Sequence, residues 1–163
     1  MCNQCGFWYH VECQNVNASQ LDQLSDKMTL FQCSQCCQDE NGKFDYEAAL
    51  GRLHKAAGEA KKENSMKKYQ AAAISESIAA RGEEQPCSLK QTDDHDIIID
   101  KVSAEILNQV GGAGSKIPLK TKADGNCLFK AVSLAVTGSE GHQERFRFWA
   151  SIELGLNIDR YEH

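Results

Sequence analysis

Six cysteine and histidine residues near the N-terminus have the types and the spacing of metal ligands. Cys2 and Cys5 form a pair separated by two residues, His10 and Cys13 form a second pair, and a third pair follows after nineteen further residues. Thiolates and imidazole suit tetrahedral Zn²⁺, and a two-residue gap lets two sulfurs hold one ion. The spacing therefore predicts a zinc cofactor, and the candidate ligands are Cys2, Cys5, His10, Cys13, Cys33 and Cys36.

This pattern, over residues 1–37, resembles the plant homeodomain (PHD) finger without its first cysteine pair. The aromatic run Gly6-Phe7-Trp8-Tyr9 before His10 matches that family, and Phe31 stands where the family usually has tryptophan. The family's cross-braced arrangement implies that its second and last pairs share one zinc. By the resemblance, the complete site consists of Cys2, Cys5, Cys33 and Cys36, while His10 and Cys13 are left with half a site.

Other interpretations of the cysteines stay open at this stage. They could be reduced, buried thiols, whereas a disulfide scaffold does not fit the lack of a hydrophobic signal before Cys2. The chain is then expected in a reducing compartment, the nucleus or the cytoplasm. Cys37 could take the place of Cys36, since spacing alone does not separate them. Otherwise Cys37 and Cys87 fit no ligand spacing and are ordinary thiols.

A second set of chemically useful residues lies at 122–132, which read Lys-Ala-Asp-Gly-Asn-Cys-Leu-Phe-Lys-Ala-Val. Asp-Gly-Asn is a tight-turn sequence, and the apolar residues after it have the spacing of a buried helix. Cys127 is therefore expected at a helix start. There the unpaired amides and the positive end of the helix dipole favour thiolate over thiol, and backbone N–H groups could face a developing oxyanion.

The string from Asp124 to Phe129 resembles the signature of the ovarian tumour (OTU) family of deubiquitinating cysteine peptidases. The resemblance spans roughly residues 117–158. It implies that Cys127 is the nucleophile that attacks an isopeptide carbonyl and that Asp124 supports the site. A packed thiol on a helix is the alternative interpretation of Cys127.

The general base of such a hydrolase must be an imidazole within reach of the thiol, and in this family it comes near the end of the domain. This chain ends at His163, and neither His163 nor His142 is expected to serve. The finger lacks a ligand pair, and the peptidase-like part lacks the C-terminal region that carries the catalytic histidine in this family. The sequence therefore predicts a fragment that is inactive by itself.

The segment between these parts is predicted to be helical and partly disordered. Alanine, lysine and glutamate dominate residues 43–80, with an expected break near Asn64 and Ser65. Its excess of lysines could lie against phosphate or an acidic tail, although a solvated linker helix fits better. Residues 82–96 are acidic and polar and are expected to form an exposed linker. A short helix is predicted to end at Gly111.

The chain has 163 residues, 41% of them hydrophobic, and a formal net charge of −5. This composition gives no reason to expect nucleic-acid binding, and no apolar run approaches the ~20 residues that cross a bilayer. The helix-like stretch from 142 to 156 carries an apolar surface that is expected to lack a partner. Its large apolar residues are Phe146, Phe148, Trp149, Ile152, Leu154 and Leu156.

The expected fold class is α+β: an incomplete zinc-stabilised finger at 1–38, a linker at 39–100, and the N-terminal part of an OTU-like α/β domain at 101–163. The expected function is that of a zinc-binding fragment of a PHD finger joined to a deubiquitinating peptidase. Ubiquitin is then the partner of the peptidase-like part. The alternative is a non-catalytic module that reads a histone tail or another peptide through the finger.

Overall fold

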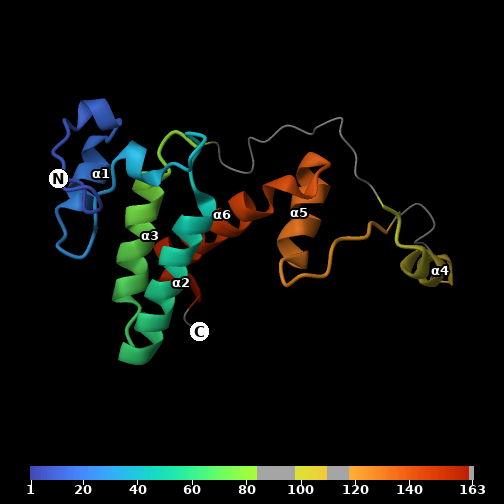
Figure 1. The fold of residues 1–163 in the computed structure, drawn as a ribbon. Helices are drawn as coiled ribbons and strands as arrows, with labels where there is room; N and C mark the ends of the chain where they lie inside the picture. The colour runs from blue at the N-terminus through green and yellow to red at the C-terminus, as the bar shows by residue number, and fades with distance from the viewer. Residues whose placement is uncertain (84–97, 110–117, 162–163) are drawn as a thin grey trace. The chain divides into compact units, whose positions relative to one another are not determined.

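The computed structural model describes residues 1–83, 98–109 and 118–161 (Figure 1). Secondary structure in these ranges is mostly helical. The α-helices are α1 (Ala18–Leu24), α2 (Tyr46–Glu63), α3 (Lys67–Ala79), α4 (Lys101–Gln109), α5 (Cys127–Thr137), α6 (Gln143–Leu156) and α7 (Ile158–Tyr161), and the 3-10 turns are η1 (Glu12–Gln14), η2 (Ser34–Cys37) and η4 (Glu140–His142). Strand pairing in the same ranges is limited to two isolated bridges, so the β component of the expected α+β class is not found there.

Two compact units make up the chain. One comprises Met1–Glu84 and Arg147–His163, and the other comprises Gln85–Phe146. The first unit therefore contains the finger region, α2, α3, most of α6 and α7. The division into three domains that the sequence suggested is not tested by this arrangement and stays a prediction.

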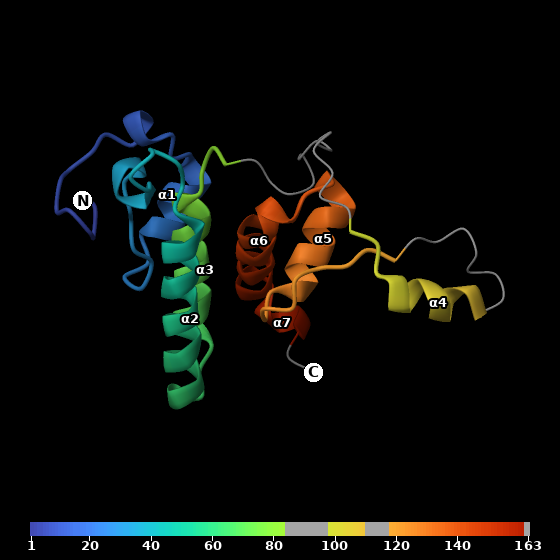
Figure 2. The same ribbon diagram turned by 45° about the vertical axis from the view of Figure 1, so that its right-hand side comes forward.

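Helices α2 and α3 form an antiparallel hairpin in the first unit and lie side by side in Figures 1 and 2. The Asp45 carboxylate caps α2 by accepting a hydrogen bond from the Ala48 backbone N–H at 2.8 Å. Asn64 ends α2 in the left-handed conformation with φ of 50°, which asparagine tolerates better than most residues. The predicted break near Asn64 and Ser65 is thus confirmed. Both helices contribute to a buried core, so they are not fully solvated.

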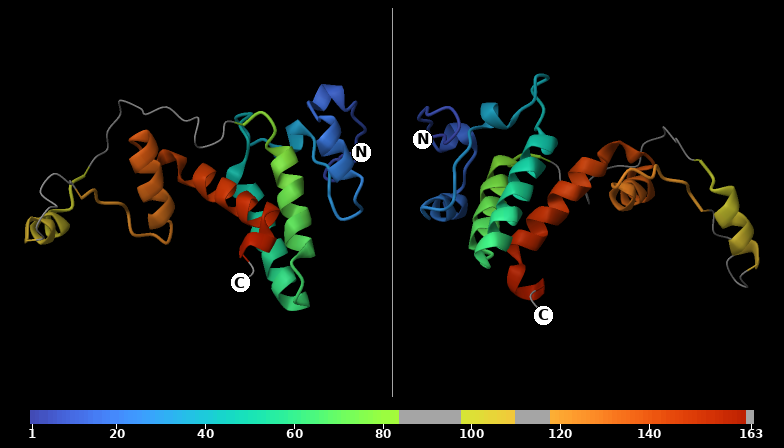
Figure 3. Two further views of the ribbon diagram at one scale, coloured as in Figure 1. Left: turned by 180° about the vertical axis from the view of Figure 1, so that it is seen from behind. Right: turned by 60° about the horizontal axis from the view of Figure 1, so that its bottom comes forward.

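The second half of α6 packs on this hairpin, as the right-hand view in Figure 3 shows. Phe148 is 0% and Ile152 is 2% exposed. The Tyr69 hydroxyl of α3 donates a hydrogen bond to the Ser151 carbonyl at 2.9 Å. The expectation that this apolar surface lacks a partner is therefore wrong. The hairpin buries the part that contains Phe148 and Ile152, whereas Leu154 and Leu156 stay exposed. The sequence had suggested only a linker in the region of the hairpin.

An aromatic cluster closes one end of the same core. The Phe148 ring lies edge-on to three others, with ring centroids 5.4 Å from Phe44, 5.4 Å from Tyr46 and 5.3 Å from Trp149. Edge-to-face pairs at these separations each add roughly 0.5–1.5 kcal/mol beyond the area that they bury. The cluster therefore ties the start of α2 to α6, about one hundred residues later in the chain.

Polar contacts attach the finger region to α3. The Leu30 backbone N–H donates to Ser75 Oγ at 2.8 Å. Arg81, after the end of α3, donates to the backbone carbonyl of Gln14 and, at 3.4 Å, to that of Gln32. Its guanidinium carbon also lies 5.6 Å from the centre of the Phe31 ring. One side chain thus holds both the segment after Cys13 and the segment before Cys33.

A partly buried ion pair lies near this attachment. Glu76 on α3 is 2% exposed and accepts two hydrogen bonds from Arg52 on α2, at 2.5 and 2.9 Å. The Gln32 side-chain amide adds a third, at 3.3 Å. A buried carboxylate is tolerated only when it is paired and hydrogen-bonded in this way.

In the second unit, α5 packs against η4. Ser133 and Thr137 of α5 are buried and both donate hydrogen bonds to the Ser139 carbonyl, at 2.5 and 3.1 Å. The opposite side of α5 is apolar, yet Leu128 is 66% and Val136 is 42% exposed. The buried helix that the apolar spacing suggested is therefore only partly found, since Leu134 is buried but Leu128 and Val136 are not. The residues that α5 buries are largely polar, because its neighbour is a polar turn.

Several expectations fall outside the described residues. The exposed linker lies there except for Gly82 and Glu83, as do Cys87, the glycine pair after α4, and His163. The described helices include none that is long and apolar enough to cross a bilayer.

Candidate metal centre and peptidase-like motif

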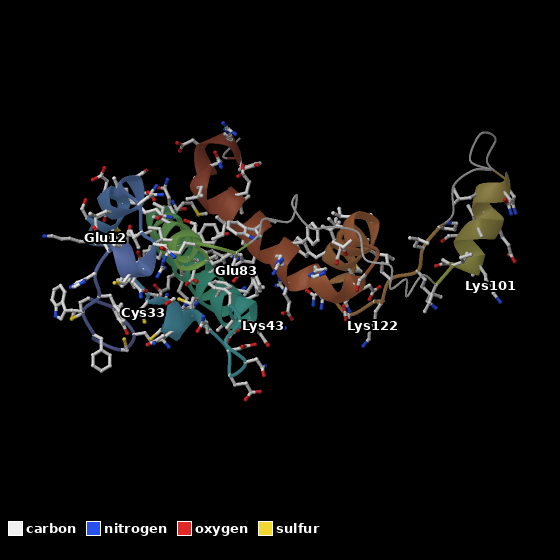
Figure 4. All side chains as sticks on the ribbon, turned by 90° about the horizontal axis from the view of Figure 1, so that it is seen from above. Glu12, Cys33, Lys43, Glu83, Lys101 and Lys122 are labelled. Atoms are coloured by element: carbon white, nitrogen blue, oxygen red, sulfur yellow. The ribbon has the colours of Figure 1, made fainter. Side chains whose placement is uncertain are left out.

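Four cysteine sulfurs meet at the N-terminal end of the first unit. They belong to Cys2, Cys5, Cys33 and Cys36, and all lie within 4.8 Å of one another. Figure 4 labels Cys33 among the side chains of this region. The two pairs come from segments about thirty residues apart, and the structure brings together the same four cysteines that the PHD resemblance implied.

Each pair sits on its own tight turn. The first turn is closed by a 2.9 Å hydrogen bond from the Gly6 N–H to the Cys2 carbonyl, with Gly6 at φ of +74°. Only glycine adopts that conformation without strain. The second turn is η2, where the Cys36 N–H donates to the Cys33 carbonyl at 3.1 Å. In each case the two-residue gap returns the second sulfur to the side of the first.

The thiols of this cluster differ in acidity. Burial raises the pKa of Cys2, but hydrogen bonds from the backbone of Cys5, Cys33 and Gln4 outweigh it and lower that pKa to about 6. The pKa of Cys33 is lowered as well, because hydrogen bonds that include one from Tyr9 outweigh its burial. Burial and the three neighbouring sulfurs raise the pKa of Cys36. Protons are therefore shared unevenly among the four.

The donor set fits zinc. A tetrahedron with Zn–S bonds of ~2.3 Å has sulfur–sulfur edges of roughly 3.8 Å. The Cys5 and Cys33 sulfurs are 3.9 Å apart, and the 4.8 Å limit on the other separations leaves only a small contraction. Four thiolates favour Zn²⁺ over hard cations such as Mg²⁺ or Ca²⁺. The cluster could therefore hold a metal ion such as zinc.

The other cysteines and His10 lie elsewhere. His10 and Cys13 are both exposed, and neither belongs to a group of three or more possible ligands in the described ranges. Cys37 is 2% exposed and its thiol donates to Gln32 Oε1 at 3.7 Å, away from the other sulfurs. Between Cys36 and Cys37, which spacing left open, the structure places Cys36 in the cluster. The roles of His10 and Cys13 as ligands stay predictions.

Cys127 is exposed at the first residue of α5, as the turn sequence predicted. Asp124, three residues earlier, is turned toward Lys130 and forms an ion pair with it. Its other oxygen accepts a hydrogen bond from the Asn126 N–H at 3.2 Å. The bond from Lys130 holds the pKa of Asp124 below its usual range. Asp124 therefore orders the loop before the helix, and its supporting role toward Cys127 is untested.

His142 is held at the other end of α5. Its backbone N–H donates to Ser133 Oγ at 3.2 Å, and Ser133 lies six residues beyond Cys127. Six residues of α-helix correspond to roughly 9 Å along the axis. No hydrogen bond joins Cys127 to an imidazole in the part of the chain that the structure describes, so a thiol–imidazole pair is not formed there.

Three residues that sequence reasoning did not assign to these sites help to build them. Tyr9 lies beside the Cys5 sulfur, Arg81 holds both cysteine-bearing segments, and Lys130 pairs with Asp124. Tyr9 and Lys130 lie within the two sequence motifs. The spacing of a motif does not predict which side chain becomes the hydrogen-bond partner of the Tyr9 hydroxyl or of the Lys130 ammonium group.

The chain was compared with known proteins. The family model described as "Vertnin, OTU domain" matches residues 118–163, which contain α5, α6 and α7. No curated protein matches the chain, and no solved structure does.

Proposed function

We propose that this protein is a zinc-binding chain that joins a PHD-type finger to part of an OTU-type cysteine peptidase domain, and that it does not hydrolyse isopeptide bonds by itself. The observation that carries the proposal is the convergence of four cysteine sulfurs within 4.8 Å from two separate turns. Zinc bound there would be structural, because four protein ligands leave no position for substrate or water.

The finger part of the proposal rests on sequence order as well as geometry. The four clustered cysteines are the ones that a PHD-type pattern assigns to a single zinc, with the aromatic run of residues 6–9 between the first pair and His10. Ligands from two turns that share one ion fix the intervening segment, which includes α1. The metal would thus set the conformation of a region with few buried apolar residues.

The peptidase part rests on the family match and on the position of Cys127. An exposed cysteine at a helix start has the surroundings of a nucleophile, with Asp124 in the preceding turn. A cysteine peptidase also needs a base within roughly 2.6–3.2 Å of the thiol. His142 is bound through its backbone near the opposite end of α5, so hydrolysis by this chain is not expected.

Two assays test the proposal. Elemental analysis of chain purified under reducing conditions should find one zinc per molecule, lost in Cys33→Ser and kept in Cys13→Ser, whose cysteine lies outside the cluster. Incubation with a ubiquitin chain should release no ubiquitin. Turnover that Cys127→Ala abolishes would contradict the second half, and a chain that binds no zinc would contradict the first.

A second candidate function is peptide recognition by the finger. A groove of about 330 Å³ lies beside the turn that carries His10, lined among others by Tyr9, Val11, Leu21, Leu30 and Phe31. Its size and apolar walls would suit an extended segment such as a histone tail. Titration with histone-tail peptides, with Leu21→Glu as the control, tests this. Equal signals from the control and the unmodified chain would count against recognition through the groove.

A further inference from the structure

One polar contact near the sulfur cluster comes from outside the set of cysteines. The Tyr9 hydroxyl lies 3.7 Å from the Cys5 sulfur, within hydrogen-bond range for sulfur. Tyr9 is partly buried and follows Cys5 by four residues, past the turn at Gly6. A 2.8 Å hydrogen bond from the Cys2 N–H to the Phe7 carbonyl closes this loop on itself. The loop that presents Cys5 therefore also presents the hydroxyl to it.

The direction of this contact follows from the chemistry of metal binding. In isolation either atom could donate. A sulfur that binds zinc is a thiolate, which has no proton to give and can only accept. The hydroxyl must then be the donor. It also hydrogen-bonds to the Cys33 sulfur, so its proton is shared between Cys33 and Cys5. A charge-assisted hydrogen bond is stronger than a neutral one.

Cys5 is the ligand that most needs such a partner. Cys2 and Cys33 are buried, whereas Cys5 is exposed as a residue and, like Cys36, only partly buried within the cluster of ligands. The Cys2 sulfur already accepts a hydrogen bond from the Cys33 backbone N–H at 3.3 Å. An exposed thiolate is the one that electrophiles and oxidants reach first, and a hydrogen bond to it withdraws charge from the sulfur.

We propose that Tyr9 is a positioning residue of the metal centre, whose hydroxyl donates to the Cys5 thiolate, orients that ligand and lowers its nucleophilicity. The inference rests on the proposed zinc site and extends it, because it names the group that protects the site's exposed ligand. Hydrogen-bond partners of metal ligands typically contribute ~10–100-fold to metal affinity.

The test compares Tyr9→Phe with the unmodified chain and with Trp8→Phe. Tyr9→Phe keeps the ring and removes only the hydroxyl. Trp8 is 81% exposed in the same loop, so Trp8→Phe controls for a general disturbance. With Co²⁺ as the probe, loss of the hydrogen bond should move the sulfur-to-metal charge-transfer band to lower energy, because the thiolate becomes a better electron donor.

Zinc affinity, measured by competition with a chelator, should fall by ~10-fold or more in Tyr9→Phe. Alkylation of Cys5 by iodoacetamide in the zinc-loaded chain, located by mass spectrometry, should become faster. Trp8→Phe should leave the band, the affinity and the alkylation rate unchanged.

The outcomes distinguish a failure of the role proposed for Tyr9 from a failure of the proposed zinc site. If the unmodified chain binds neither Zn²⁺ nor Co²⁺, the proposed site itself is wrong. If it binds both, and Tyr9→Phe has the same charge-transfer band and affinity, only the role of Tyr9 is refuted. Equal effects of Tyr9→Phe and Trp8→Phe would also refute it, since the packing of the loop would then be responsible.

Discussion

Gly155 of α6 lies against Ala73 of α3 in the first unit. A Cβ atom added to Gly155 would lie 2.3 Å from the Ala73 Cβ and 3.3 Å from Tyr69 Cε1. Ordinary carbon–carbon contacts begin near 3.4 Å. Neither Cβ can move by rotating a side chain, so the helices would have to separate. Gly155→Ala therefore tests whether α6 packs on the hairpin in solution.

Two opposing effects set the size of the change. Overpacking of a tight contact costs about 1–3 kcal/mol, and the upper end applies here because a rigid pair of atoms must move by about an ångström. Alanine in place of glycine inside a helix contributes about 1 kcal/mol in the other direction. The free energy of unfolding should therefore fall by about 2 kcal/mol.

Urea unfolding followed by tryptophan fluorescence measures this, because Trp149 is partly buried and packs against the core beside Phe148. Gly58→Ala on α2 is the matched control: its added Cβ meets nothing within 4 Å, so it should stabilise by up to about 1 kcal/mol. In the double variant Ala73→Gly/Gly155→Ala the clash is removed, and the two changes should be non-additive by about 3 kcal/mol, the cost assigned to the clash alone. Stabilisation by Gly155→Ala, like that by Gly58→Ala, would refute the packing of α6 on α3.

Three further predictions follow from the buried polar groups. Arg52→Met should lower the free energy of unfolding by about 2–3 kcal/mol, since it leaves the 2% exposed Glu76 charge with Gln32 as its one side-chain partner among the described residues. In urea titrations, Arg52→Met/Glu76→Gln should recover part of the loss. At pH 8 a thiol reagent should modify exposed Cys127 but not Cys37, because burial raises the pKa of Cys37 to about 11. Equal rates of modification of Cys127 and Cys37, measured by mass spectrometry, would count against the burial of Cys37. Zinc affinity should fall as the pH falls from 8 to 6.5, by about tenfold per pH unit for each proton that zinc must displace, because the raised pKa of Cys36 keeps that thiol protonated. The slope should steepen below pH 6, where Cys2, with its pKa of about 6, also gains a proton. A flat affinity profile in chelator competition would contradict the four-thiolate site.

Local signals in the sequence anticipated local structure. The two-residue gaps predicted that Cys2 and Cys5, like Cys33 and Cys36, form a ligand pair, since that spacing is a property of a single turn. That these two pairs share one ion was implied by the PHD resemblance. The helix break at Asn64 and the helix start at Cys127 were also predicted, because each depends on residues within one turn of it.

Contacts between distant segments were not predicted. The apolar residues of α6 indicated a buried face but not what would cover it, and the alanine-rich α2 and α3 gave too thin an apolar stripe to suggest a core. The contact between Gly155 and Ala73 depends on how α6 and α3 are aligned along each other, which the sequence of either helix does not specify. The Arg52–Glu76 pair likewise depends on how α2 and α3 are aligned. On α5, spacing identified an apolar face correctly, but burial depends on a neighbour that spacing does not specify.

The proposed metal centre holds a single zinc ion between four cysteines. Zinc K-edge X-ray absorption on the purified chain tests it most directly, because nitrogen, oxygen and sulfur ligands differ in bond length. The four-cysteine site predicts four sulfur neighbours at ~2.3 Å and no shorter contacts. A spectrum with nitrogen at ~2.0–2.1 Å, as His10 would supply, or with oxygen in place of sulfur, would contradict it.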